Sequence, residues 1–358
     1  MRAADFDFHL PAELVAQAPA PNRDDSRLMV LRRHSGSIEH RQFPDLLEYL
    51  KPKDVLVLNN SRVIPARLRG LNEKSGGQFE LFLLEEIRPN DWWVMLRPGK
   101  RARPGTRIVL RNPDGSPAPI SATVLEKNSE GHRRVAFEGT TNILTRIDEL
   151  GEVPLPPYIA RPDRAQLDED RERYQTTFAE FPGSVAAPTA GLHFTKALLD
   201  QIRARGVKVS FVTLHVGLGT FAPVKSEHLA EHTMHEERYQ ISDATAEAIR
   251  DAKAEGGRVF AVGTTTLRLL ESVANETGGN VVAGAGRTRI FIYPPYKFKL
   301  VDVLLTNFHL PRSTLVMLVS AFAAPGKTTG REIILAAYAE AVRQRYRFYS
   351  YGDAMLIA

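Results

Sequence analysis

The sequence of 358 residues contains no cysteine, which excludes disulfides, thiolate nucleophiles and thiolate metal ligands. It also lacks any run of about 18 apolar residues, so it predicts no membrane-spanning helix. Its first residues, MRAADFDFHLPAEL, include acidic residues and a proline where an export signal would be apolar. We therefore expect a cytoplasmic protein without a membrane partner.

Several motifs that would identify a reaction are absent. The chain has no Gly-x-Ser-x-Gly nucleophile turn, no GxGxxG dinucleotide fingerprint and no phosphate-binding P-loop. Zinc deaminase chemistry is excluded because its signature requires cysteine ligands. His228, His232 and His235 would share one face of a helix, but the chain has no HExxH motif and no evident fourth ligand, so we expect no metal site.

The charged residues indicate a mixed surface. Lysine and arginine number 47 against 42 acidic residues, and the net charge of +5 alone says little about partners. Basic residues gather between Arg97 and Arg107, and basic residues stand beside aromatic ones between Tyr293 and Lys299. This combination suits a surface that follows a nucleic-acid backbone and stacks on bases, although solvated charges and strand aromatics would give the same pattern.

The pattern of the chain changes twice, and its length exceeds the usual size of a single core. Residues 54–58 have the pattern of a buried strand. Between 63 and 151, short alternating runs separated by turns predict strands without helices, which is typical of a small barrel or sandwich. After 151, helices and strands alternate. The predicted fold is a discontinuous α/β domain with a mixed sheet (1–62 and 152–358) that carries an inserted all-β barrel-like domain (63–151).

Capping residues and glycines delimit the elements of the α/β part. The predicted helices are 195–205, 243–255, 264–274, 313–323 and 331–346. The predicted strands are 207–216, 258–262, 286–292, 301–306 and 347–357. The segment 152–192 is long, irregular and rich in proline, so we expect a functional loop that is mobile around 163–172.

Two predicted strands end in segments that suit a ligand. Gly263-Thr264-Thr265 follows one strand and begins a helix, where free N–H groups and the helix dipole attract a carboxylate or a phosphate. A plain helix cap is the alternative interpretation. Asn307-Phe308-His309 follows another strand and precedes a helix, again at a place where α/β sheets bind ligands, with capping or packing as the competing role.

A third strand end carries Gly217, Gly219 and Thr220 just after His215. Glycines let the backbone approach a ligand closely, although a simple turn would also contain them. His193 lies just before the predicted helix 195–205. Because strand carboxyl ends and helix amino ends of α/β units face the same side, His193 and His215 are predicted to open onto one cleft. Alternatively, both rings form hydrogen bonds that support the end of the sheet.

Taken together and in order, longer strings resemble those of one family. These strings are Asp7-Phe8-His9-Leu10-Pro11, Asn59-Asn60-Ser61-Arg62-Val63-Ile64-Pro65-Ala66-Arg67, Ala186-Ala187-Pro188-Thr189-Ala190-Gly191-Leu192-His193-Phe194-Thr195, Thr213-Leu214-His215-Val216-Gly217, Thr306-Asn307-Phe308-His309-Leu310-Pro311 and Tyr349-Ser350-Tyr351-Gly352-Asp353. They span almost the whole chain and are highly specific. The sequence is similar to the S-adenosylmethionine:tRNA ribosyltransferase-isomerase family of the queuosine pathway. One departure is Pro294-Pro295, where the family usually has Pro-Gly.

The resemblance implies an unusual use of S-adenosylmethionine. Its ribosyl part would be transferred and isomerised onto the aminomethyl group of a 7-deazaguanine at the wobble position of a tRNA. The products would be epoxyqueuosine-tRNA, adenine and methionine. The resemblance also implies a two-domain fold with an inserted β-barrel. We expect a monomer that acts on tRNA without a metal or an obligate protein partner.

The implied reaction needs a base for the C5′ proton, an acid for the leaving adenine and a site that excludes water. Histidine suits both proton roles near neutral pH, and the candidates are His193 and His215, with His235 and Glu237 in reserve. The expected S-adenosylmethionine contacts are Gly217, Gly219, Thr220, Gly263, Thr264, Thr265, Asn307 and His309. The expected RNA contacts are Asn59, Asn60, Arg62, Arg67, Arg97, Lys100, Tyr158, Tyr296, Lys297 and Lys299.

Two other functions stay open. An S-adenosylmethionine-dependent RNA methyltransferase would need a glycine-rich loop after its first strand, which the chain lacks, and it would release S-adenosylhomocysteine instead of adenine. A non-catalytic tRNA-binding protein that uses the barrel would leave the helix-start and strand-end loops without a purpose. Absence of S-adenosylmethionine binding would favour this last alternative.

Overall fold

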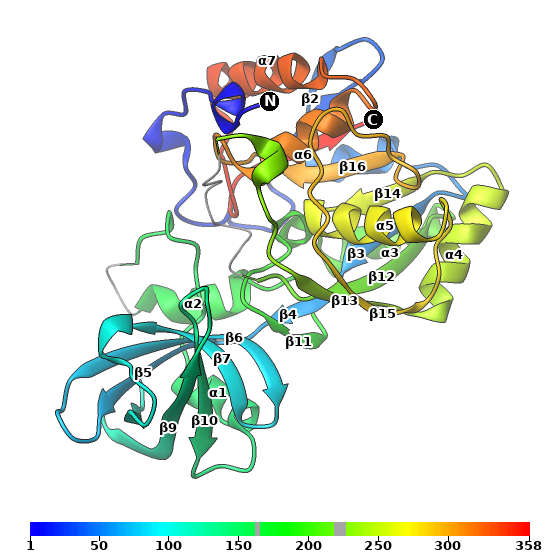
Figure 1. Cartoon of the computed structure of the whole chain (residues 1–358). Coiled ribbons are helices and arrows are strands. Elements are labelled where there is room, and N and C mark those ends of the chain that lie inside the picture. The colour runs from blue at the N-terminus through cyan, green and yellow to red at the C-terminus, as the bar shows by residue number, and fades with distance from the viewer. Residues whose placement is uncertain (162–164, 218–226) are drawn as a thin grey trace.

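The computed structural model describes residues 1–161, 165–217 and 227–358 (Figure 1). A larger α/β part contains both chain ends, and a smaller all-β part lies apart from it (Figure 1). The two are connected next to β4 (Ser61–Val63) and β11 (Phe181–Ser184), which pair in parallel as a small sheet. None of the described helices is long and apolar enough to cross a membrane.

The larger part is built on a mixed sheet. Its strands are β1 (Arg27–Leu31), β2 (Ile38–Gln42), β3 (Val55–Asn59), β12 (Lys208–Leu214), β13 (Glu237–Ile241), β14 (Val259–Val262), β15 (Gly284–Thr288), β16 (Val303–Asn307) and β17 (Ala354–Ile357). Among the described residues their order is β15-β13-β12-β3-β14-β16-β17-β1-β2. The central neighbours β12, β3, β14 and β16 run parallel to one another. Their carboxyl ends therefore lie at one edge of the sheet, where α/β sheets usually bind ligands.

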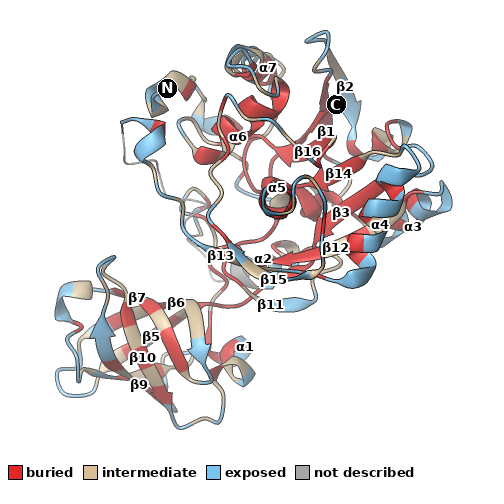
Figure 2. Cartoon of the chain, turned by 45° about the vertical axis from the view of Figure 1, so that its right-hand side comes forward, coloured by how far each residue is buried: buried red, intermediate tan, exposed pale blue. Residues whose placement is uncertain are grey.

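The core lies on both faces of this sheet. The covering helices are α3 (Lys196–Ala204), α4 (Asp243–Ala254), α5 (Thr264–Glu276), α6 (Thr314–Ala323) and α7 (Gly330–Arg343). Successive side chains of a strand point to opposite faces. Strand β3 is buried along its whole length (Figure 2). Leu56 and Leu58 therefore pack on the side of α3, whereas Val55 and Val57 pack on the side of α4 to α7.

Local capping chemistry sets the helix starts, as the sequence predicted. Thr195 Oγ1 accepts a hydrogen bond from the Leu198 N–H at 3.1 Å and begins α3. Ser242 and Ser313 cap α4 and α6 in the same way. Each cap satisfies one of the first N–H groups, which have no partner inside the helix. The predicted starts of these three helices are confirmed.

The smaller part is a closed antiparallel barrel of its own. Its strands are β5 (Arg67–Asn72), β6 (Gln78–Arg88), β7 (Asp91–Arg97), β8 (Arg107–Arg111), β9 (Pro117–Lys127) and β10 (Arg133–Glu138). Among the described residues they close in the order β10-β7-β6-β5-β8-β9. Leu68, Leu81, Val94 and Val135 belong to a core that is separate from that of the main sheet. The predicted fold class, a mixed α/β sheet with an all-β barrel, is confirmed.

One segment that was predicted to be an irregular, mobile loop contains a helix. Helix α2 (Ala165–Arg173) covers most of the predicted range 163–172. Asp170 on this helix is buried, and it accepts hydrogen bonds from Arg161 Nε at 2.5 Å and from the Tyr351 hydroxyl at 2.7 Å. Polar contacts anchor α2 to the rest of the chain. The helix therefore lacks the apolar stripe by which a helix is usually recognised in a sequence.

Three other elements differ from the prediction. The strand predicted at 286–292 is β15 at 284–288, and the apolar residues that follow pack onto the core outside the ladder. The strand predicted at 347–357 is divided, because the chain turns at Tyr349, whose φ is 72°: Phe348 forms only an isolated bridge with Val15, and β17 joins the sheet. His228, His232 and His235 do not share a helix, since only a short 3₁₀ turn at Leu229–Glu231 lies between them.

Gly151 lies where the chain returns from the barrel, at a close backbone contact. A Cβ there would lie 1.9 Å from the carbonyl oxygen of Pro65 and 2.8 Å from that of Ile147. We expect Gly151→Ala to lower the free energy of unfolding by about 1–3 kcal/mol, because the backbone must shift to relieve the overlap. Urea-induced unfolding measures this. Gly77→Ala is the matched control, since its nearest new contact is Ser75 Oγ at 3.4 Å. Equal unfolding midpoints for the two variants would contradict the prediction.

Candidate functional site

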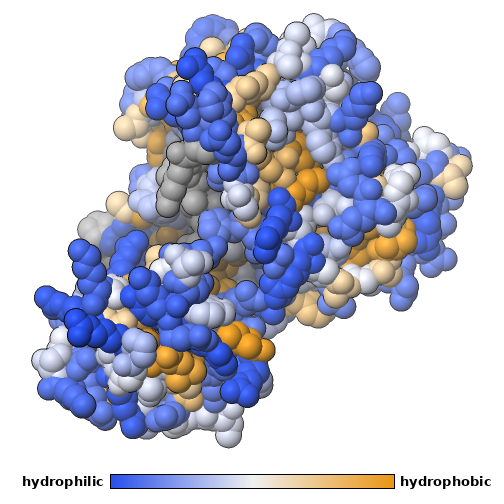
Figure 3. Space-filling view, viewed as in Figure 1, coloured by the Kyte–Doolittle hydropathy of each residue, from blue (hydrophilic) through white to orange (hydrophobic). Residues whose placement is uncertain are grey.

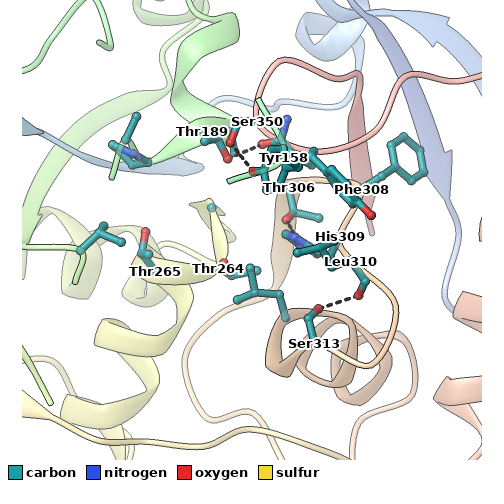
Figure 4. A pocket seen from close by; sticks show the side chains of 18 residues that line it. Tyr158, Thr189, Thr264, Thr265, Thr306, Phe308, His309, Leu310, Ser313 and Ser350 are labelled. Atoms are coloured by element: carbon teal, nitrogen blue, oxygen red, sulfur yellow. Dashed lines mark hydrogen bonds between the residues drawn. The ribbon is translucent and has the colours of Figure 1, made fainter. Parts of the chain in front are cut away.

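A cavity of about 60 Å³ lies at the carboxyl ends of β14 and β16 (Figure 4). We call it the strand-end cavity. Its walls are segments 187–190, 263–265 and 306–310, and the lining is completed by Tyr158, Val216, Ser313, Leu315, Tyr349 and Ser350. Threonine, asparagine and serine side chains alternate with aromatic and aliphatic ones. This composition suits an organic ligand that carries a few polar groups.

The turn from β14 into α5 forms one wall. Gly263 has a φ of 88°, a left-handed conformation that a side chain would strain. The turn brings the first N–H groups of α5 and the positive end of its dipole to the cavity, next to Thr264 and Thr265. Thr265 Oγ1 is buried and has no hydrogen-bond partner among the described residues. This wall is therefore suited to an anionic or hydrogen-bonding ligand group.

The end of β16 forms another wall. Thr306 Oγ1 and His309 Nε2 lie 2.8 Å apart, and Thr189 Oγ1 donates to Asn307 Oδ1 at 2.9 Å (Figure 4). Burial lowers the pKa of His309 to about 3, so its ring is neutral at pH 7. The wall offers hydrogen bonds without adding positive charge.

His193 lies behind this wall, at the end of a 3₁₀ turn (Thr189–His193). The Asn307 amide nitrogen lies 3.2 Å from His193 Nε2, and Ser26 Oγ lies 2.8 Å from His193 Nδ1. Because an amide nitrogen can only donate, Nε2 accepts and Nδ1 carries the proton that is donated to Ser26. Burial lowers the pKa of His193 to about 4, in agreement with a neutral ring.

His193 also lines a second cavity of about 20 Å³, together with Arg23, Arg173 and Arg347. We call this second cavity the arginine pocket. His215 lines neither cavity. The structure therefore corrects the prediction that His193 and His215 open onto one cleft, because hydrogen bonds on both ring nitrogens hold His193 behind the Asn307 wall.

His215 is half-buried at the end of β12. Its Nδ1 is buried without a hydrogen-bond partner among the described residues, and Gly183 lies so close that a Cβ there would be 2.8 Å from this atom. Burial, and to a smaller extent Arg238, lower the pKa of His215 to about 4. The ring is therefore neutral at pH 7 and has an unengaged nitrogen. Its chain neighbour Val216 lines the strand-end cavity.

Glu237 is buried and engaged in contacts that support the fold. It forms a buried ion pair with Arg268 at 2.6 Å, and its other carboxylate oxygen accepts from the Gly217 N–H at 3.3 Å. It thereby fixes the chain just after β12. His235 is exposed, and the structure places it in neither cavity.

The predicted S-adenosylmethionine contacts fall into two sets. Gly263, Thr264, Thr265, Asn307 and His309 lie together around the strand-end cavity, although two separate segments supply them. The other set, Gly217, Gly219 and Thr220, comes directly after β12 in the sequence. Gly217 is held by the buried ion pair, and the predictions for Gly219 and Thr220 fall outside the described residues.

Two predicted RNA contacts are corrected by their burial. Asn59 is 1% exposed, and its side chain donates to the Leu214 carbonyl at 2.9 Å. Asn60 is 5% exposed, donates to Glu180 at 3.1 Å and accepts from Thr213 at 2.8 Å. Both amides join β3 to β12 and have no surface left for a nucleic acid.

The remaining RNA candidates lie nearer the surface. The exposed ones are Arg62, Arg97, Lys100, Lys297 and Lys299. Arg67 is half-buried, and its Nε has no partner among the described residues. Tyr296 is half-buried with its hydroxyl accepting from Asn275 at 2.7 Å, and Tyr158 lines the strand-end cavity instead of an open face. Hydrophilic side chains cover much of the barrel and the main domain in Figure 3.

Glu271 connects the Tyr296–Lys299 segment to the cavity. This fully buried carboxylate on α5 accepts from the N–H groups of Lys299, Leu300 and Val301 at 2.9–3.0 Å. The same helix begins at the cavity wall. Glu271 therefore joins the backbone at Lys299 to the helix that begins at the cavity wall.

The sequence analysis missed several lining residues. Thr189, Thr306, Tyr349 and Ser350 line the strand-end cavity but were not singled out as ligand contacts. Each lies inside one of the strings that carried the family resemblance. That resemblance was the available signal, because hydroxyl groups of this kind also occur at ordinary turns and strand ends. Among the described residues, no cluster of histidine and acidic residues could hold a metal ion.

The fold combines a mixed α/β sheet with a closed β-barrel, and a cavity lies at the ends of its parallel strands. The chain belongs to the queuosine biosynthesis protein family, whose sequence profile matches residues 3–357. It is 52% identical over 357 residues to the S-adenosylmethionine:tRNA ribosyltransferase-isomerase of Acetivibrio thermocellus, with 100% of both chains covered. It is 38% identical to the crystallised S-adenosylmethionine tRNA ribosyltransferase of Thermotoga maritima, with a TM-score of 0.54 over 99% of this chain and 100% of that one. The resemblance inferred from the sequence is confirmed.

The buried neutral histidines predict a pH-dependent stability. His309 has a pKa of about 3 in the folded chain against 6.5 ordinarily, so the unfolded chain binds more protons between these values. Its contribution to stability is complete above pH 6.5 and declines as the pH falls towards 3. We expect the loss of unfolding free energy between pH 7 and pH 5 to be about 1–2 kcal/mol smaller in His309→Gln than in the natural chain. Urea unfolding at several pH values measures this, with the exposed His34→Gln as control. Parallel pH profiles for all three proteins would disprove it.

Proposed function

We propose that this chain transfers and isomerises the ribosyl part of S-adenosylmethionine onto the aminomethyl group of a 7-deazaguanine at the wobble position of tRNA. The products are epoxyqueuosine-tRNA, adenine and methionine. The proposal is supported by the full-length relationship to S-adenosylmethionine:tRNA ribosyltransferase-isomerases. The structural observation that carries it is a cavity at parallel strand ends that combines a helix start, a buried unpartnered hydroxyl and aromatic walls.

The residues of the strand-end cavity fit S-adenosylmethionine. The start of α5, at Thr264 and Thr265, suits a carboxylate, and the unpartnered Thr265 hydroxyl suits a polar ligand atom. Tyr158 and Tyr349 offer flat apolar surface to a purine. We assign the donor to this cavity.

Two neutral histidines support the proton steps. The donor's sulfonium group acidifies its C5′–H bond, so a neutral base near the cavity can remove that proton. We assign this role to His215, whose ring is neutral at pH 7 and whose chain neighbour Val216 lines the cavity. His193 acts as a positioning residue that orients Asn307. Glu237 holds the chain after β12, and His235 receives no role.

The acceptor tRNA is proposed to bind across the barrel and the main domain. Arg62, Arg97, Lys100, Lys297 and Lys299 are the proposed phosphate contacts, since they are exposed. We further propose that 63–151 folds as an inserted domain of the discontinuous α/β domain 1–62 and 152–358. The enzyme would act as a cytoplasmic monomer that needs no metal.

The function is tested by incubating the chain with S-adenosylmethionine and a tRNA that carries the aminomethyl base. Nucleoside mass spectrometry should detect epoxyqueuosine in the digested tRNA. A base that has gained a methyl group would support the methyltransferase alternative. An unchanged base, with the tRNA bound, would support a non-catalytic binding protein.

The donor site predicts a selective effect at Thr265. Its hydroxyl forms no hydrogen bond within the described residues, so Thr265→Val should keep the stability of the fold. We expect S-adenosylmethionine affinity to fall about tenfold, measured by calorimetry. Thr266→Val is the matched control, because the Thr266 hydroxyl donates to the Val262 carbonyl at 2.7 Å and faces no ligand. That control should lose stability and keep affinity. Unchanged affinity in Thr265→Val would refute the assignment.

The proposed base predicts a kinetic effect at His215. His215→Ala should reduce the single-turnover rate by roughly 10²–10⁴-fold, the usual contribution of a proton-transfer group. Affinities for S-adenosylmethionine and tRNA should stay within about twofold, since the ring removes a proton and does not anchor either substrate. His235→Ala, at an exposed position, is the control. A rate loss below about tenfold in the folded variant would demote His215 to a structural role.

A further inference from the structure

The arginine pocket concentrates positive charge in a small volume. Arg23, Arg173 and Arg347 line it together with His193 and Ser350. The arginines belong to the N-terminal segment, to the end of α2 and to the turn before β17. The pocket, of about 20 Å³, is smaller than the strand-end cavity of about 60 Å³.

Neutral acceptors hold these guanidinium groups in place. Arg23 donates to the backbone carbonyls of Leu192 at 3.3 Å and Glu172 at 3.0 Å, and Arg173 and Arg347 also donate to backbone carbonyls. Within the described part of the chain, none of the three forms an ion pair with a carboxylate. Their positions are therefore fixed by hydrogen bonds to neutral groups.

Two carboxylates near the pocket form ion pairs with other arginines, and one of them, Asp353, also accepts from the Arg347 backbone N–H at 2.9 Å. Asp353 pairs with Arg27 at 3.1 Å, and Asp170 pairs with Arg161 at 2.5 Å. Arg347 Nε is buried and has no hydrogen-bond partner among the described residues. A buried donor without a partner is costly unless a ligand occupies it. The pocket thus combines three fixed cations with an unused donor.

Burial, and after it the neighbouring Arg173, lower the pKa of Arg23. Arg23 and Arg173 thus repel each other in a site that is partly shielded from water, and Glu172 and Tyr351 offset part of this repulsion. An anion in the pocket would remove this repulsion.

The arginine pocket adjoins the strand-end cavity. Ser350 lines both, and its hydroxyl lies 2.7 Å from the Tyr158 hydroxyl. His193 lines the arginine pocket, and its Nε2 accepts from Asn307, which lines the strand-end cavity. A group bound by the arginines would therefore lie one side chain away from a ligand in the strand-end cavity.

We propose that the arginine pocket binds a phosphodiester group of the acceptor tRNA, next to the nucleotide whose base reaches the strand-end cavity. This inference rests on the proposed function. Guanidinium groups match the oxygens of a phosphate in geometry and charge. The carboxylate of the donor has related oxyanion chemistry, but the start of α5 already offers it a place. The RNA is therefore the assigned source.

The first test measures tRNA affinity at several salt concentrations. Arg23→Gln should weaken binding about tenfold and reduce the slope of log affinity against log salt by about 1, as the loss of one phosphate contact predicts. Arg23→Lys should keep most of the slope, and it serves if Arg23→Gln does not fold. Arg203→Gln, on the exposed side of α3 and paired with Asp200 at 2.8 Å, is the control and should bind as the natural chain does.

A second test locates the phosphate. Anticodon stem–loops, each with one neutral methylphosphonate flanking the wobble nucleotide, are bound to the natural chain and to Arg23→Gln. One position should weaken binding to the natural chain about tenfold and have no effect on Arg23→Gln. Equal losses in both proteins at every position would overturn the proposal.

The remaining outcomes are also decisive. Reduced S-adenosylmethionine affinity with an unchanged salt slope would assign the pocket to the donor carboxylate and overturn the RNA proposal. An unchanged slope in both Arg23 variants would overturn it as well. Failure of the proposed function would appear separately, as absence of epoxyqueuosine with the natural chain while tRNA binding and its salt slope persist.

Discussion

Strands β12, β3, β14 and β16 run parallel, and this alignment determines where the remaining features of the site lie. It places the turn at Gly263 and the segment that starts at Thr306 at one edge of the sheet. Both segments leave the regular ladder of the sheet, and they lie beside the free N–H groups at the start of α5. A sheet with alternating strand directions would have divided the same segments between two edges. The strand-end cavity is a consequence of this arrangement.

A chain of polar contacts crosses the wall behind the cavity. It runs from Thr189 through Asn307 and His193 to Ser26. Burial keeps the histidine neutral, so the chain has a defined donor at each step and adds no positive charge to the cavity wall. The positive charge lies beyond it, in the arginine pocket. The wall thus separates a neutral cavity suited to the donor from a cationic pocket suited to a phosphate.

Features that depend on local chemistry could be predicted from the sequence. Thr195, Ser242 and Ser313 reveal helix starts because a cap bonds to its own helix. The alternating runs of the barrel and the glycine turn at Gly263 are also signals carried by residues that are close together in the sequence. The fold class and five of the cavity residues followed from such signals.

Features that depend on distant polar partners could not be predicted. Helix α2 is anchored through Asp170 and Tyr351, which are 181 positions apart. His193 is held by Ser26, 167 positions away, and Asn59 by Leu214, 155 positions away. A polar residue looks the same in the sequence whether it faces solvent or such a partner. The sequence therefore assigned Asn59 to an RNA surface and His193 to an open cleft.

The central claim is that the strand-end cavity holds S-adenosylmethionine as a ribosyl donor. The most direct test is to follow the fate of labelled S-adenosylmethionine in the presence of tRNA that bears the aminomethyl base. The account predicts that adenine and methionine appear in equal amounts and in step with modified tRNA. Release of S-adenosylhomocysteine, or no turnover of the donor while the tRNA is bound, would contradict it.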